Sequence, residues 1–72
     1  MEDVTFIIRI EDEYENLKKR VGTLKSFIKT DRFQIINEVQ QKLLKEQLVV
    51  MKEYLKILKE RLENLDKNRN DG

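Results

Sequence analysis

The sequence predicts an all-α fold, a helical hairpin in which a long helix, a short helix at the turn and a longer helix follow one another. Three observations support this prediction. The 72 residues include no Pro and only two Gly, so few positions interrupt a helix. Charged residues make up 40% of the chain and apolar residues 39%, which is typical of long amphipathic helices. The apolar residues also recur at alternating intervals of three and four, the spacing of one helical face.

The first helix is expected to run from about residue 4 to Lys29. Acidic residues precede basic ones along it, as the helix dipole favours. Gly22 lies inside this helix and costs about 1 kcal/mol relative to Ala, so it either admits close approach of another backbone or marks a bend. The apolar seam of the helix consists of Ile7, Ile10, Tyr14, Leu17, Val21, Leu24 and Ile28.

The turn is expected just after this helix, because Thr30 and Asp31 are both favoured N-cap types. Asp31 with Gln34 has the spacing of a capping box, and Asn37 with Gln40 repeats that spacing. We therefore expect a short helix at the turn and a second helix start at Asn37.

The longest helix should begin at Asn37 and reach about Leu65. A second stripe runs beside its apolar seam and has an apolar centre and polar ends. A two-helix hairpin needs one apolar stripe per helix, so the second stripe predicts that other subunits pack there. We expect one oligomerising domain over residues 1–66 and a flexible polar tail over residues 67–72. The seam is Leu44, Leu48, Met51, Leu55, Leu58, Leu62 and Leu65, and the second stripe is Gln47, Val50, Tyr54, Ile57 and Arg61.

Length and composition exclude several classes of protein. Small domains are commonly stabilised by a disulfide, a metal or a partner subunit, and the chain has neither Cys nor His. Self-association is therefore expected, with no metal or cofactor. A net charge of +1 disfavours long nucleic acid as a partner, so a DNA-binding regulator is the least favoured function. No apolar run approaches the ~18 residues of a membrane span, and no signal peptide is evident, so we expect a soluble intracellular protein.

The sequence also favours a binding protein over an enzyme. It offers no nucleophile that an imidazole base activates and no glycine-rich phosphate loop. Tyr14 is open to two interpretations, an interface aromatic or a platform on which a nucleobase stacks. Lys29 and Thr30 combine a cation, a hydroxyl and a helix start, which suits phosphate, although ordinary helix termination is the simpler interpretation. Arg61 suits either an ion pair with a neighbouring subunit or a phosphate.

The spacing of Tyr14 and Lys29 constrains any shared ligand. They are 15 positions apart, which corresponds to about 22 Å along one helix. A small ligand that contacts both residue types must therefore lie between subunits.

The pattern Leu24-x-x-Phe27-Ile28-x-x-Asp31-x-Phe33, followed by Gln47, Met51, Tyr54 and Arg61 on fixed registers of the leucine seam, resembles a family of small phage proteins that counter CBASS immunity. The match covers most of the chain. CBASS uses cyclic oligonucleotides as alarm signals, and members of this family act as sponges that bind the messengers and keep effectors silent. The resemblance implies a helical homohexamer in the cytoplasm of the infected bacterial host, with ligands between subunits and no turnover.

The resemblance also implies roles for particular residues. In the family, a Tyr of the first helix contacts the base of a cyclic dinucleotide such as cGAMP and a Lys near the end of that helix contacts phosphate; Tyr14 and Lys29 stand at the matching positions. A separate site takes cyclic trinucleotides with a polar residue beside the Tyr, a Thr near the turn and an Arg of the last helix. The matching positions for that site are Glu15 or Asn16, Thr30 and Arg61. Glu15 departs from the neutral polar residue that the family pattern has after the Tyr.

The leading hypothesis is therefore a sponge for cyclic oligonucleotides. The alternative is a structural or adaptor coiled coil whose second stripe binds a helix of another protein.

Overall fold

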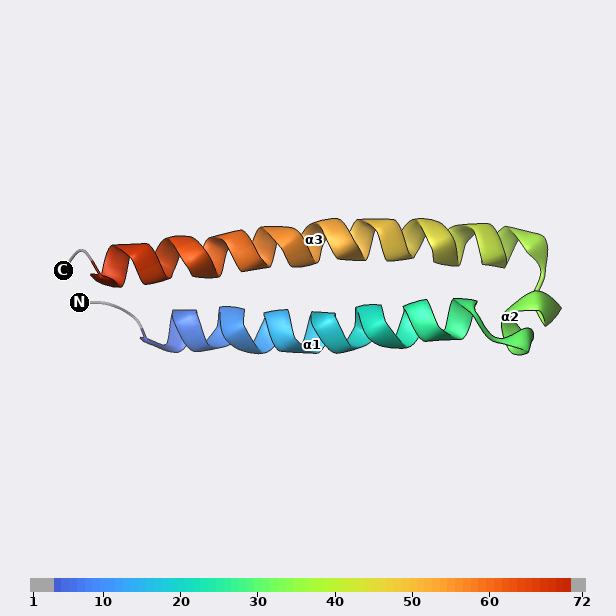
Figure 1. The fold of residues 1–72 in the computed structure, drawn as a ribbon, viewed down its shortest axis with the longest axis horizontal. Helices are drawn as coiled ribbons and strands as arrows, with labels where there is room; N and C mark the ends of the chain where they lie inside the picture. Colours follow the sequence, from blue (N-terminus) through green and yellow to red (C-terminus); the bar gives the residue numbers. More distant parts are fainter. Residues whose placement is uncertain (1–3, 71–72) are drawn as a thin grey trace.

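The computed structural model describes the backbone of residues 4–70 and the side chains of residues 5–65. The elements are α1 (Val4–Ile28), α2 (Asp31–Ile35) and α3 (Glu38–Asn70). Helices α1 and α3 run antiparallel side by side, and the short α2 lies at the end where the chain reverses (Figure 1). The hairpin is 54 Å long and 15 Å across. The long, short, longer order of helices that the sequence predicts is confirmed.

The core is a single line of contact between the two predicted seams. Ile10, Leu17 and Val21 of α1 and Leu58 of α3 are the buried members of this core, and Leu58 is 0% exposed. Each long helix has only one long neighbour, so many of the seam residues stay half-buried. The side chains that pack against these four buried residues are Tyr14, Leu48, Met51, Leu55, Leu62 and Leu65.

Helix α2 closes the hairpin with one aromatic side chain. Phe33 is almost completely buried, and its ring meets that of Phe27 edge to face, with centroids 6.0 Å apart. The ammonium group of Lys45 lies 5.7 Å from the centroid of the Phe33 ring. Aromatic and cation–π contacts of this kind add to the stabilisation from burial, so Phe33 ties the turn to both long helices.

The predicted cap of α3 is confirmed. The side-chain oxygen Oδ1 of Asn37 accepts a hydrogen bond from the backbone N–H of Gln40 at 2.9 Å, which satisfies one of the donors left free at a helix start. Nearby, the Nε2 atom of Gln41 donates to the carbonyl oxygen of Ile36 at 2.8 Å.

The predicted capping box of Asp31 and Gln34 is wrong. Thr30 is the residue that precedes α2, and Asp31 is already helical. The Thr30 hydroxyl does not cap α2 and instead donates to the carbonyl oxygen of Phe27 at 2.7 Å. It therefore satisfies an acceptor at the end of α1, because free carbonyls there compete for the same hydroxyl.

The helix ends also differ in detail from the prediction. Helix α1 ends at Ile28, one residue early, and α3 extends to Asn70, past the predicted end near Leu65. No Gly or Pro stands in α3 to stop it. The domain boundary expected after residue 66 thus falls inside a helix and stays a prediction, and residues 71–72 lie outside the described part.

Helix α1 continues without a break through Gly22, where an added Cβ would meet nothing within 4 Å. Close backbone approach at Gly22 is therefore not made within the described hairpin. In the described range, residues 4–70, no helix is long and apolar enough to cross a membrane.

Replacing Leu58 by Ala should lower the free energy of unfolding by about 2 to 5 kcal/mol, because it leaves a cavity at the centre of the core. Urea denaturation followed by circular dichroism measures this change. Ile8→Ala, at a position that is more than half exposed, is the control. A loss for Leu58→Ala no greater than that for Ile8→Ala would contradict the assignment of Leu58 to the centre of the core.

Candidate functional site

The six predicted site residues lie at three levels of the hairpin. Tyr14, Glu15 and Asn16 are in the middle of α1, and Lys29 with Thr30 lies just beyond its end, beside α2. Arg61 lies on α3, alongside the beginning of α1, so it is at the opposite end from the turn. Within one chain, the structure does not bring these three levels together.

Tyr14 belongs partly to the core. Its side chain is half-buried and packs against the buried cluster around Leu58. Glu15 and Asn16, the next two residues, are exposed, and the Asn16 amide donates to the Asp12 carboxylate at 3.3 Å. The middle of α1 therefore presents part of an aromatic side chain beside one carboxylate and one amide.

Lys29 and Thr30 are both exposed at the turn. The ammonium group of Lys29 is available to an anion, whereas the single hydroxyl hydrogen of Thr30 is already donated to the carbonyl of Phe27. A phosphate that binds Thr30 as an acceptor must take over that hydrogen. The turn thus offers a cation directly and a hydroxyl donor only after rearrangement.

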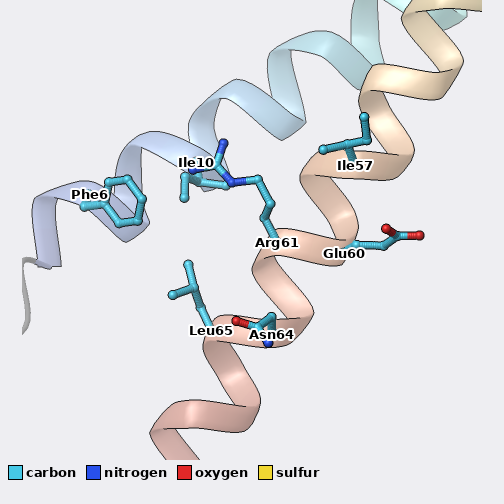
Figure 2. Close-up of a pocket in the computed structure, with 7 residues that line it drawn as sticks. All are labelled: Phe6, Ile10, Ile57, Glu60, Arg61, Asn64 and Leu65. Atoms are coloured by element: carbon cyan, nitrogen blue, oxygen red, sulfur yellow. The ribbon is translucent and has the colours of Figure 1, made fainter.

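Arg61 lines a hollow at the open end of the hairpin, here called the Arg61 hollow. Its volume is about 410 Å³, and its walls are Phe6, Ile10, Ile57, Glu60, Arg61, Asn64 and Leu65. Figure 2 shows Arg61 reaching from α3 toward Phe6 and Ile10 on α1. The guanidinium carbon lies 5.7 Å from the centroid of the Phe6 ring, within the range of a cation–π contact. Apolar walls beside a guanidinium suit a planar, anionic ligand.

Phe6 is a residue that sequence reasoning did not single out as part of a site. It is an aromatic side chain that remains about half exposed, near the start of α1. The signal in the sequence was that Phe6 falls outside the apolar seam, which begins at Ile7 and therefore does not explain it.

A second hollow of about 330 Å³, the Tyr54 hollow, lies nearer the middle of the same pair of helices. The Tyr54 hydroxyl of α3 donates a hydrogen bond to the Glu13 carboxylate of α1. This bond raises the pKa of Tyr54 above its ordinary value of 10.0, and partial desolvation and the charge of Glu13 act in the same direction, while Arg61 opposes them. The lining residues are Arg9, Asp12, Glu13, Asn16, Leu17, Arg20 and Tyr54.

These contacts refine the interpretation of the second stripe of α3. Its polar members Tyr54 and Arg61 are engaged with α1 of the same chain. Its apolar members Val50 and Ile57 are 64% and 53% exposed. Gln47, which contacts Met51 of its own helix, and the apolar members are thus left uncovered by α1, and no oligomer is needed to explain Tyr54 and Arg61.

Comparison with known families identifies the group to which this fold and site belong. A family model described as Sequestin matches residues 4–64, which is most of the chain. The chain belongs to the Sequestin family. This match confirms the resemblance to the phage anti-CBASS sponges that the sequence shows. Comparisons with curated proteins and with solved structures give no match.

The name Sequestin denotes sequestration, which means retention of a bound ligand rather than its conversion. The matched range contains all six predicted site residues and both hollows except for Leu65. Among the described residues of this Sequestin, no cluster of three carboxylates or other metal-binding side chains is placed to hold a metal ion. The groups that the hairpin offers to a ligand are aromatic rings, cations and amides.

Glu13→Gln should lower the pKa of Tyr54 toward its ordinary value, because the acceptor carboxylate and its charge are removed together. Ultraviolet difference titration in a Tyr14→Phe background isolates the signal of Tyr54. A raised folded-state pKa means that the stabilisation is fully present below pH 10 and is lost as the pH rises through the raised value. An unchanged titration of Tyr54 after Glu13→Gln would show that the hydrogen bond does not persist in solution.

Proposed function

We propose that this Sequestin is a phage immune-evasion protein that binds cyclic oligonucleotide messengers of CBASS immunity and sequesters them without degradation. The observation that carries the proposal is the family match over residues 4–64, which includes the Tyr and Lys positions of the sponge pattern. The protein acts in the cytoplasm of the infected bacterial host. It works by stoichiometry, because each bound messenger is one that cannot reach its effector.

The ligand lies between subunits of a homo-oligomer, a hexamer by resemblance. Tyr14 and Lys29 are 15 residues apart on one nearly continuous helix, or about 22 Å, so a cyclic dinucleotide cannot touch both in a single chain. Tyr14 of one subunit stacks on a base, and Lys29 of another contacts phosphate. The half-buried position of Tyr14 is compatible with this role, since the core holds part of the side chain while the rest stays accessible.

A second, trinucleotide-binding site draws on Arg61, Thr30 and a polar residue next to Tyr14. Of the two polar candidates, Asn16 is neutral and its amide donates hydrogen bonds, whereas the Glu15 carboxylate repels phosphate. Arg61 has apolar walls and an aromatic ring beside it, which suits a base next to a phosphate. Arg61 and Thr30 lie at opposite ends of the hairpin, so this site also requires more than one subunit.

The proposal is tested by calorimetry of the purified protein with a panel of cyclic di- and trinucleotides, including cGAMP. The complex is then denatured and the released ligand identified by mass spectrometry. Tight binding with recovery of the unaltered cyclic nucleotide is expected. Recovery of a linear product would show that the protein cleaves its ligand rather than sequestering it. The absence of binding across the panel would reject the proposal.

Tyr14→Ala should weaken cyclic dinucleotide binding about fivefold or more, because stacking of one base contributes about 1 to 3 kcal/mol. Lys29→Ala should weaken it as well, because it removes the cation that contacts phosphate. Lys25→Ala is the matched control, since Lys25 is an exposed cation one turn earlier on α1. Native mass spectrometry checks that the oligomer remains intact. Unchanged affinity in both site variants would rule out this pair of contacts.

The second candidate function is a structural or adaptor protein that binds a helix of another protein. The exposure of Val50 and Ile57 is the observation that favours it. In that case Val50→Asp or Ile57→Asp removes a protein partner, and no cyclic nucleotide raises the melting temperature of the protein.

A further inference from the structure

Helix α3 contains a seven-residue repeat that the core of the hairpin does not explain. Residues 45–51, 52–58 and 59–65 read KEQLVVM, KEYLKIL and KERLENL. The Leu in the fourth position of each repeat packs in the core, which accounts for its recurrence. The Lys and Glu that open each repeat are exposed in all three copies. Packing against α1 therefore places no requirement on these six charged residues.

The repeat organises the outer surface of α3 into two seams, each with the alternating spacing of three and four that one helical face requires. Successive residues of a helix are about 100° apart, so the two seams lie side by side on the helix surface. The acidic seam is Leu43, Glu46, Val50, Glu53, Ile57 and Glu60. The basic seam is Lys42, Lys45, Val49, Lys52, Lys56 and Lys59.

Both seams are uncovered in the hairpin. Every member is exposed, including the three large apolar side chains of the acidic seam and Val49 of the basic seam. Figure 2 shows Glu60 pointing away from α1 while Arg61 beside it turns toward α1. Within the described chain, none of these charged residues forms an ion pair, and the contact of Lys45 with Phe33 is the one interaction recorded for them.

The chemistry of the two seams identifies what fits them. A seam with alternating carboxylates and large apolar groups needs a partner helix that supplies cations at the same seven-residue interval. The acidic seam paired with itself would bring carboxylates of two copies together, and the basic seam paired with itself would do the same for ammonium groups. The basic seam of a second copy has the required charge and the same period.

We propose that the acidic seam of one copy of this chain packs against the basic seam of the next. Because the two seams are different surfaces, the contact is heterologous, and repetition around a closing rotation yields a ring. The inference rests on the homo-oligomer of the proposed function and specifies the contact that builds it. Burial of Leu43, Val50 and Ile57 supplies apolar stabilisation, and the charges select the partner and register.

Charge reversal tests the contact. The triple variant E46K/E53K/E60K carries cations on both seams, and K45E/K52E/K59E places three carboxylates on the basic seam, where Lys42 and Lys56 remain. Each should therefore dissociate to the 8.7 kDa monomer in native mass spectrometry. An equimolar mixture of the two should assemble again into mixed oligomers, because each variant then finds the opposite charge. The variant with all six reversals keeps the net charge of +1 and should self-assemble as the natural sequence does.

Circular dichroism of each variant confirms that the hairpin still forms, and Lys19→Glu, at an exposed position of α1, is the control for a charge change outside the seams. Triple variants that stay assembled would overturn the proposal, and so would a mixture or six-fold variant that fails to reassemble while remaining helical. Triple variants that stay assembled but lose cyclic nucleotide binding would instead make the lysines a ligand surface.

The outcome is separable from that of the proposed function. Failure of the natural protein to bind any cyclic nucleotide, together with rescue of assembly by charge exchange, removes the function and keeps this contact. If the natural protein binds a cyclic nucleotide but its assembly does not respond to charge reversal, the proposed function stands and the proposed contact is rejected.

Discussion

The burial available to two helices is the constraint on which the rest of the structure depends. Two antiparallel helices meet along one line, so each protects a single seam, and among the described residues only Leu58 and Phe33 are almost completely removed from water. Net stability is a small difference between burial and conformational entropy, and so narrow a core leaves little surplus. The apolar groups left outside it, such as Val50 and Ile57, are what a neighbouring subunit can use to add to that surplus.

The polar contacts across the hairpin fix the register between α1 and α3. A step of seven residues along α1, from Phe6 to Glu13, corresponds to a step of seven back along α3, from Arg61 to Tyr54, and both pairs are in contact. A slip of one residue would separate both pairs while moving the leucine seam off the contact line. Apolar burial thus holds the helices together, and these paired side chains mark which residues stand opposite one another.

The arrangement explains how a small helical hairpin holds the residues proposed to bind one ligand far apart within the single chain. Tyr14 lies at mid-length and Lys29 at the turn, and a straight helix holds them apart. A rigid rod of this kind can present separate halves of a site to its neighbours, so that assembly and binding become one property. The proposed pairing of acidic and basic seams has the same logic, because one helix carries both halves of the contact.

Much of the fold was determined by the sequence alone. The heptad seams, the Asn37 cap and the order of the helices are local or periodic features, and helical geometry converts spacing directly into a face. The tertiary structure decided what spacing cannot express. In the folded hairpin the Thr30 hydroxyl donates to a carbonyl at the end of α1. Arg61 makes a cation–π contact with Phe6, and Tyr54 donates a hydrogen bond to Glu13. The last two contacts depend on which residues of two distant segments stand opposite one another, and that register exists only once both seams are packed.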